Sequence, residues 1–382
     1  MRFTHLKLEN WRNFLSVDVP LDRRVFVVGA NASGKSNFLD AFRFLRDIAD
    51  PQGGLQRAVT HTRGSVSKIR SLHARRYPNV AIEVELDLGE QQRWSYRLEF
   101  SQDNQRQPVV KKESVRRGEH VVLTRPDSED RADQSRLTQT HLEQVNANKE
   151  FRQVAQFLGR VTYLHLVPQL VREPDRSAGR VRDPYGGDFL AQLARMKRSN
   201  QKQFDSRLRK IKDALRVAVP QLKDLVLEPD ERGVPHLRGL YEHWRPKAGW
   251  QLEDQFSDGT LRLLGLLWAL LDGSAPLLLE EPELSLHAAV VRHIPAMMER
   301  IGRKVERQTI VSTHSAEMLA DEGIGAESVL LLEPTREGTK VVHTPSDKQI
   351  LSLLDGGMTI AEAVLPRTAP PSVSQLSFFE RG

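Results

Sequence analysis

The chain has 382 residues, of which 39% are hydrophobic and 28% are charged, a balance typical of one large globular domain or of a core with a sizeable lobe. It contains no cysteine, which excludes disulfides and thiolate metal sites and is consistent with a reducing cytoplasm. The formal net charge of +6 favours polyanions such as nucleic acid as partners, although a solvated surface with a mild excess of arginine gives the same charge.

The sequence offers no segment for membrane insertion. Residues 1–9 alternate polar and apolar side chains and lack the continuous apolar core of a signal peptide. The most apolar run, residues 261–271, contains Arg262 and is too short to span a bilayer. We therefore expect a cytoplasmic protein that does not cross a membrane by itself.

The first predicted elements are two strands and a helix. Polar–apolar alternation predicts a strand over residues 4–9, and an apolar run predicts a buried strand over residues 24–28. That run leads directly into the segment 29–36, and a helical pattern follows. The apolar face of this helix consists of Phe38, Leu39, Phe42 and Leu45.

The middle of the chain has a different pattern. Alternation between residues 79 and 123 predicts an antiparallel β lobe, and the polar segment 126–135 predicts a loop. A further strand is expected over 161–166. Residues 173–187, rich in Arg, Asp, Gly and Pro, predict a mobile connection.

Residues 189–225 are predicted to be mainly helical, and they are too short and irregular for a long coiled coil. This segment is very basic and could contact nucleic acid phosphates; the alternative is a solvated helix face. Its basic side chains between residues 195 and 216 are Arg195, Lys197, Arg198, Lys202, Arg207, Arg209, Lys210, Lys212 and Arg216.

An α/β pattern resumes in the last third of the chain. Helices are predicted over 260–271 and 285–300. The tail from residue 366 is rich in proline and is expected to be flexible. The predicted strands are 276–280, 309–312, 329–332 and 339–342.

The segment Gly-Ala-Asn-Ala-Ser-Gly-Lys-Ser at residues 29–36 matches the P-loop pattern. Backbone N–H groups of such a loop turn toward phosphates, and the following helix N-terminus adds a favourable dipole. Lys35 should reach the β- and γ-phosphates, and the Ser36 hydroxyl should bind Mg²⁺. The alternative is a chance match, which the flanking strand and helix disfavour.

A second motif is the apolar strand that ends in Glu280 and Glu281, followed by Pro282. In an α/β fold such acids lie at the carboxyl edge of the sheet, where ligands bind. Glu280 would hold Mg²⁺ through water, and Glu281 would act as general base on the attacking water. The alternative is an acid cluster at a helix N-terminus.

Two weaker motifs complete the set. Ser257 and Gly259 at a helix start could form a second phosphate cradle, or Ser257 could simply cap the helix. His314 follows an apolar strand and could sense a γ-phosphate, or it could cap the next helix.

The order P-loop, Ser-x-Gly, acidic strand and histidine resembles the ABC ATPase superfamily. Within it, the sequence is most similar to the SMC/RecF/overcoming-lysogenization-defect ATPases, in particular short bacterial AAA family ATP-binding proteins linked to DNA repair and anti-phage defence. The resemblance covers residues 1–75 and 250–345. Its strongest marks are Leu-Glu-Asn-Trp-Arg-Asn-Phe at 8–14, the segment 29–37, and Glu-Glu-Pro-Glu-Leu-Ser-Leu-His at 280–287.

The resemblance implies further roles. The Ser257–Gly259 segment matches the signature motif, which contacts the γ-phosphate of ATP on the opposite subunit, so that two ATP molecules lie between two heads. Phe256 and Asp258 depart from the usual Leu and Gly, but Ser-Asp-Gly forms are frequent in this branch. Residues 283–287 match the D-loop, and His314 matches the switch histidine. For the Q-loop, Gln52 and Gln56 both remain candidates.

The resemblance therefore implies ATP and Mg²⁺ as ligands of defined residues. The catalytic residues would be Lys35, Glu281 and His314, and the metal ligands Ser36 and Glu280. The nucleotide would be bound by Arg12, Asn13, Gly29, Asn31, Ala32, Ser33, Gly34, Lys35, Ser36, Asn37, Ser257 and Gly259.

The expected fold class is α/β, a P-loop ABC-type ATPase head with a β lobe and an inserted basic helical segment and without a long coiled coil. The expected domains are the ATPase core at 1–75 and 250–345, the β lobe at 76–170, the basic helical insertion at 171–249, and a C-terminal segment at 346–382 with a flexible tail.

The expected function is that of an ATP-dependent, dimerising ATPase. The partners implied are a second copy in a head-to-head homodimer, DNA, and a separately encoded nuclease or toxin that the ATPase gates. A nuclease domain within the chain is not expected, because only 68 residues follow His314. The alternative is the ATP-binding subunit of an ABC transporter, which the separation of 222 positions from Lys35 to Ser257 disfavours.

Overall fold

The computed structural model describes residues 1–74, 78–89, 93–173, 183–244 and 249–369. The chain divides into two units. The first unit comprises Met1–Thr162, Ser274–Leu278 and Glu306–Gly382, and the second comprises Tyr163–Gly273 and Leu279–Val305. The predicted division into an ATPase core, β lobe, helical insertion and C-terminal segment stays a prediction.

One sheet of the first unit is antiparallel, with the strand order β2-β1-β4-β5-β6-β7. It contains the antiparallel strands predicted between residues 79 and 123, and it also includes the N-terminal hairpin, because Leu6 of β1 pairs with Val84 of β4. The strands are β1 (Arg2–Trp11), β2 (Phe14–Pro20), β4 (Val80–Asp87), β5 (Arg93–Gln102), β6 (Pro108–Arg117) and β7 (His120–Arg125).

The other large sheet has the strand order β15-β14-β3-β13-β12-β8. β3 lies between two parallel neighbours, β13 and β14, which is why its four apolar residues are buried on both faces. Each strand predicted for this sheet is present. The strands are β3 (Arg24–Gly29), β8 (Thr162–Leu164), β12 (Leu277–Glu280), β13 (Thr309–Thr313), β14 (Val329–Thr335) and β15 (Gly338–His343).

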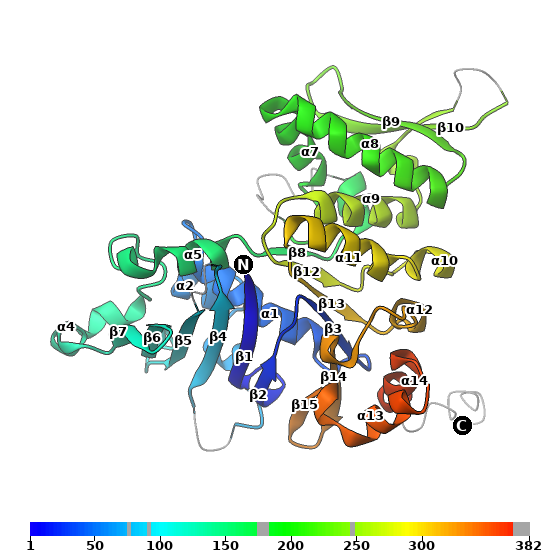
Figure 1. Ribbon diagram of the computed structural model, residues 1–382. Helices are drawn as coiled ribbons and strands as arrows, with labels where there is room; N and C mark the ends of the chain where they lie inside the picture. Colours follow the sequence, from blue (N-terminus) through cyan, green and yellow to red (C-terminus); the bar gives the residue numbers. More distant parts are fainter. Residues whose placement is uncertain (75–77, 90–92, 174–182, 245–248, 370–382) are drawn as a thin grey trace, which may run out of the picture. The chain divides into compact units, whose positions relative to one another are not determined.

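Helix α1 (Lys35–Ala49) follows the 29–36 segment and forms the core of the first unit with α5 (Arg152–Gly159) (Figure 1). Aromatic rings attach it to the antiparallel sheet: the Phe42 ring lies 4.8 Å from that of Phe3, and the Phe44 ring lies 5.3 Å from that of Phe100. The predicted apolar face is buried. The same helix contacts β3 and β13, so α1 packs against both sheets.

The other helices of the first unit are short: α2 (Leu55–Thr60), α3 (Val66–Ile69), α4 (Ser128–Ala132), α12 (Ala316–Leu319), α13 (Lys348–Asp355) and α14 (Ile360–Val364). The prediction of a loop over 126–135 is wrong, because α4 lies there. Asp127 and Asp130 form a capping box at its N-terminus, and buried Asp130 also pairs with Arg125 at 2.8 Å.

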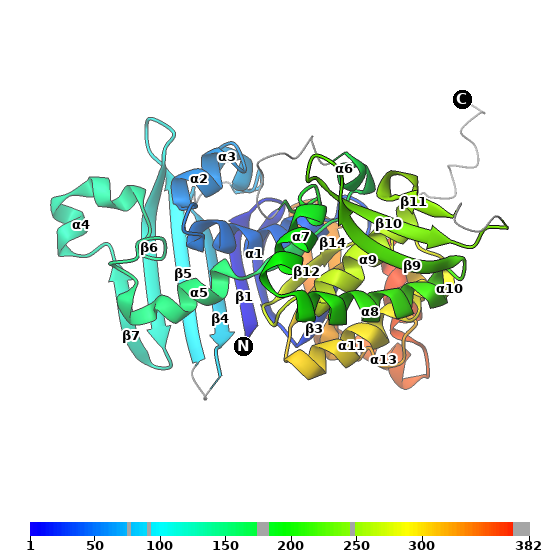
Figure 2. The same cartoon turned by 90° about the horizontal axis from the view of Figure 1, so that it is seen from above.

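The second unit has an apolar core between helices and a small sheet. Helix α8 packs on α7, α9 and β9 (Figure 2), and Trp268 of α9 lies among the rings of Phe189 and Phe204. The helices are α6 (Pro168–Arg172), α7 (Phe189–Ser199), α8 (Gln201–Ala218), α9 (Asp258–Leu271), α10 (Ala288–Val291) and α11 (Ile294–Val305).

The predicted helical insertion contains more than helices. Its helical part ends at Ala218, and a three-stranded sheet of order β11-β10-β9 follows. The strands are β9 (Leu222–Pro229), β10 (Pro235–Tyr241) and β11 (Trp250–Leu252). The single helix predicted over 285–300 is two helices, α10 and α11.

Most of the predicted mobile connection and most of the predicted flexible tail lie outside the described residues. Within the part of the chain that the structure describes, no helix has both the length and the apolar character required to cross a bilayer.

Candidate nucleotide site

The P-loop joins β3 to α1 in the first unit. Gly34 caps α1 with φ +101° and no side-chain hydrogen bond, so the first backbone N–H groups of the helix have no side-chain acceptor at this cap. Glycine suits this position because residues with a β-carbon rarely adopt a φ of this sign. The loop therefore has the backbone shape of an anion cradle.

Three side chains of the loop fit a magnesium-bound triphosphate. The Lys35 ammonium is almost fully buried and lies 3.0 Å from the Gly29 carbonyl oxygen and 3.2 Å from that of Ala30. Ser36 is exposed in the first turn of α1. The hydroxyl of Ser33 is buried without a hydrogen-bond partner among the described residues. A cation, a hydroxyl and an unsatisfied buried donor thus gather at one loop, which suits an anionic ligand.

Asn13 connects the tip of the β1–β2 hairpin to the P-loop. Its Nδ2 donates to the Ser33 carbonyl at 2.8 Å and to Thr339 Oγ1 at 2.7 Å, and its Oδ1 accepts from Asn37 at 2.8 Å. Thr339 also donates to the Ser33 carbonyl at 2.8 Å. No motif pointed to Thr339, and only the fold of β15 identifies it as a brace of the P-loop.

Arg12, the other predicted residue of the hairpin tip, has φ +54° and ion-pairs with Asp40 of α1 at 3.0 Å. Asp40 also receives two hydrogen bonds from Arg63, at 2.7 and 2.9 Å. Burial of Asp40 would raise its pKa, but the charge and hydrogen bonds of Arg63, with Arg43 and Arg12 nearby, lower the pKa to about 2. The carboxylate therefore stays charged at neutral pH.

His314 follows β13, which runs parallel to β3 with Thr313 paired to Val28. The parallel register brings exposed His314 to the sheet edge from which the P-loop starts. The alternative prediction, that His314 caps the next helix, is wrong, because Ser315 is the N-cap of α12 and accepts a hydrogen bond from Met318 N.

Ser257 and Gly259 lie in the second unit, at the start of α9. Ser257 is the N-cap, with its Oγ 3.2 Å from Thr260 N, so the capping prediction is confirmed. The serine is nevertheless exposed and retains acceptor capacity. Gly259 packs against the D-loop segment, since a β-carbon there would lie 2.6 Å from the Ser285 carbonyl oxygen.

An arginine of α6 orders this helix start. Arg172 pairs with Asp258 at 2.7 Å and donates to the Phe256 carbonyl at 2.5 Å. On the next turn of α9, burial lowers the pKa of Arg262, and the charges of Asp258 and Glu281 oppose that shift. Arg172 was not predicted, because nothing in the local sequence separates it from the other arginines around it.

Glu280 is the last residue of β12 and Glu281 follows it, and both belong to the second unit. The Tyr163 hydroxyl donates to Glu280 Oε2, and His165 Nδ1 lies 3.3 Å from the Glu280 carbonyl oxygen. Glu281 has φ +43°, an uncommon conformation for a non-glycine residue that turns the chain sharply after the strand. Tyr163 was missed because it lies in a predicted strand without any motif.

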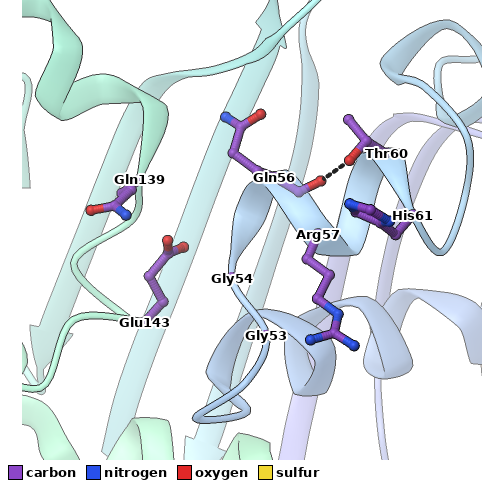
Figure 3. A pocket seen from close by; sticks show the side chains of 8 residues that line it. All are labelled: Gly53, Gly54, Gln56, Arg57, Thr60, His61, Gln139 and Glu143. Atoms are coloured by element: carbon purple, nitrogen blue, oxygen red, sulfur yellow. Dashed lines mark hydrogen bonds between the residues drawn. The ribbon is translucent and has the colours of Figure 1, made fainter.

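The two Q-loop candidates remain unassigned. Gln56 Nε2 donates to the backbone oxygens of Pro108 and Thr138 at 2.7 and 2.8 Å, so its amide braces the β lobe, whereas Gln52 is exposed. Gln56 also lines a cavity of about 430 Å³ in the first unit (Figure 3). The other lining residues are Gly53, Gly54, Arg57, Thr60, His61, Gln139 and Glu143.

The basic segment is less available for an external polyanion than its sequence indicates. Five of the nine cations between residues 195 and 216 are bound within the second unit: Arg195, Lys197, Arg207, Lys212 and Arg216. Arg207, for example, is buried, pairs with Asp272 at 2.6 Å and stacks on Trp268. The other four, Arg198, Lys202, Arg209 and Lys210, are exposed. Arg195 and Arg216 are also exposed, although they form contacts within the unit.

Solved structures of Smc heads have a similar fold. One is an SmcHead bound to the C-winged helix domain of ScpA, with a TM-score of 0.57, 14% identity, and 89% of this chain and 97% of that chain covered. Another is the Smc head domain with an extended coiled coil, bound to the C-terminal domain of ScpA from Pyrococcus furiosus, with a TM-score of 0.51, 14% identity, and 92% and 99% covered.

In sequence, the chain is similar to a short part of one curated protein. Over 69 residues it is 36% identical to Endonuclease GajA of Bacillus cereus (strain VD045), a stretch that is 18% of this chain and only 12% of the endonuclease. A family model covers far more. Residues 24–320 match the model described as "AAA domain, putative AbiEii toxin, Type IV TA system", which is more than half of the chain, and the protein therefore belongs to this family of AAA ATPases with an SMC-head-like fold.

Proposed function

We propose that the protein binds and hydrolyses ATP with Mg²⁺. The observation that carries the proposal is the P-loop, in which nearly buried Lys35 and the unsatisfied Ser33 hydroxyl lie on a loop braced by Asn13. Such a cradle is shaped for the β- and γ-phosphates of a nucleotide. Membership of the AAA family supports the same conclusion.

The roles of the remaining residues follow from chemistry and motif position. Ser36 and Glu280 would hold Mg²⁺, which when bound neutralises charge on the phosphates. Glu281 would accept a proton from the attacking water, and Lys35 and His314 would stabilise charge on the γ-phosphate. The order of the motifs along the chain, P-loop, Ser-x-Gly, acidic strand and histidine, supports this grouping.

We further propose that two copies act together, head to head. Exposed Ser257 and closely packed Gly259 are suited to receive phosphate oxygens at a helix N-terminus. In the ABC ATPases that the sequence resembles, this motif contacts the γ-phosphate of the ATP bound to the opposite copy. ATP would then hold the dimer together, and hydrolysis would release it.

The ATP cycle would gate a partner in anti-phage defence or DNA repair. Sequence similarity to part of Endonuclease GajA supports a nuclease, or a toxin, as the separately encoded effector. DNA would contact the exposed cations of α7 and α8, such as Arg209 and Lys210. Changing both to glutamate should weaken DNA binding and reduce its salt dependence, and unchanged binding would remove this segment from the proposal.

The proposed ATPase activity is tested by two variants with opposite expected results. Lys35→Ala should lose ATP binding in equilibrium titration, because the cation on the β- and γ-phosphates is removed. Glu281→Gln should bind ATP as the unaltered chain does but release phosphate at least 100-fold more slowly, in line with the loss of a general base. Equal ATP binding by Lys35→Ala and the unaltered chain would contradict the proposal.

A further inference from the structure

The Arg12 side chain contacts α1 at Asp40, one helical turn after Ser36 in the first turn of the helix. Asp40 follows Ser36 by four positions on α1, so both side chains lie on the same side of the helix. The Arg12 guanidinium reaches Asp40 at 3.0 Å, while the neighbouring residue Asn13 contacts the P-loop carbonyl of Ser33. Arg12 is thus anchored beside the loop that is proposed to receive phosphates.

The backbone at this position is fixed as well. Arg12 N donates to the Ile69 carbonyl at 2.6 Å, and its Nη1 lies 3.3 Å from the Lys68 carbonyl oxygen. The flanking residues Trp11 and Phe14 pair across the hairpin. Because Arg12 has a left-handed backbone conformation and is held by these contacts, the direction of its side chain is fixed.

The two arginines that donate hydrogen bonds to Asp40 are not equivalent. Arg63 makes two hydrogen bonds to Asp40 and one of 3.0 Å to Asp47, and its side chain is 1% exposed. Arg12 makes one hydrogen bond to Asp40, its side chain is 25% exposed, and its Nε has no hydrogen-bond partner among the described residues. Arg63 therefore fixes the position of the Asp40 carboxylate, whereas the Arg12 guanidinium still has an N–H group that can donate to an anion.

We propose that Asp40, locked by Arg63, is a positioning residue that aligns the Arg12 guanidinium for the phosphates of the bound nucleotide. This inference rests on the proposed function of the P-loop. Asp40 does not contact the nucleotide itself; it acts through Arg12, which would keep its contact with Asp40 while a second edge of the guanidinium binds a phosphate oxygen.

A double-mutant cycle on the full chain tests the proposal, with the affinity for ATP and Mg²⁺ as the readout. Arg12→Ala should weaken binding about tenfold, the loss expected for one charge-assisted hydrogen bond. Asp40→Asn should weaken it by a similar factor in the unaltered chain. In the Arg12→Ala background, Asp40→Asn should weaken ATP binding by less than about twofold more, because the arginine through which Asp40 acts is absent.

Asp47→Asn is the matched control, since Asp47 pairs with Arg63 at 3.0 Å and, among the described residues, forms no ion pair with Arg12. It should lower the melting temperature while leaving ATP affinity within about twofold of the unaltered chain. If Asp40→Asn does not fold, Asp40→Glu replaces it in the cycle, because it retains the charge and shifts the carboxylate by one methylene.

Equal losses from the Asp40 substitution in both backgrounds would overturn the inference, as would ATP affinity that is unchanged by Arg12→Ala. Failure of the underlying proposal gives a different result: the unaltered chain and Lys35→Ala would then bind ATP equally poorly. The two failures are therefore distinguishable in one set of titrations.

Discussion

Gly259 lies so close to Ser285 that a β-carbon on the glycine would be 2.6 Å from the serine carbonyl oxygen. Ser285 itself has φ +62°, so the chain turns sharply where it meets the start of α9. The start of α9 and the turn at Ser285 are therefore packed closely against each other within the second unit.

Gly259→Ala should therefore destabilise the protein by about 1–3 kcal/mol, because the obstructing atom is backbone. Gly356→Ala is a suitable control, since that glycine has φ −77° and its β-carbon would first meet an atom at 3.3 Å. Urea unfolding of both variants measures the effect. Equal stability of Gly259→Ala and the unaltered chain would show that the contact is not tight in solution.

Asn13→Ala should weaken ATP binding about tenfold and lower the melting temperature. The substitution removes two donated hydrogen bonds and one accepted hydrogen bond at the P-loop, and such losses cost about 1–3 kcal/mol when a buried partner is left unsatisfied. Thr339→Val should have a smaller effect, because Asn13 still holds the Ser33 carbonyl. ATP titrations that rank the two variants the other way would contradict this account of the brace.

Tyr163→Phe should slow ATP hydrolysis about tenfold while changing ATP affinity little. The phenol donates to the Glu280 carboxylate, and losing a hydrogen bond to a charged group misplaces the proposed metal ligand. His165→Gln is the comparison, since His165 approaches only the backbone oxygen of Glu280. Steady-state rates over a range of Mg²⁺ concentrations provide the test, and an unaltered rate for Tyr163→Phe would remove Tyr163 from the site.

The stabilisation contributed by Asp40 should disappear in acid. Its pKa of about 2 lies below the value of about 3.9 expected in the unfolded chain. A lowered carboxyl pKa stabilises the folded state above pH 4, by an amount on the order of 2 kcal/mol, and this contribution is lost as the pH falls from about 4 toward 2. The stability difference between the unaltered chain and Asp40→Asn should therefore narrow over that interval in urea unfolding, and a constant difference would disagree with the lowered pKa.

Local patterns predicted much of the fold. The strand, loop and helix over residues 24–49 are specified by a buried apolar run, two glycines and a 3.6-residue apolar repeat. The end of α8 had a signal as well, because Pro220 lies between Ala218 and Leu222, where the helix gives way to β9. The prediction of a mainly helical segment up to residue 225 is therefore wrong beyond Ala218.

Contacts between distant parts of the chain could not be predicted in this way. The pairing of β1 with β4 joins residues far apart in sequence, and a strand does not identify its partner by alternation alone. The ion pair of Arg63 with Asp40 and the hydrogen bond of Thr339 to Ser33 likewise arise only from the fold. The P-loop was found because its residues are contiguous, whereas its braces are not.

The central claim, that two copies close on ATP, is tested most directly by the mass of Glu281→Gln in light scattering. This variant should retain ATP, so the mass should rise from the 43.4 kDa of one chain to twice that value when ATP and Mg²⁺ are added. Adding Ser257→Arg should prevent the rise by obstructing the signature segment. A mass that is the same with and without saturating ATP, in a variant shown to bind the nucleotide, would contradict the account.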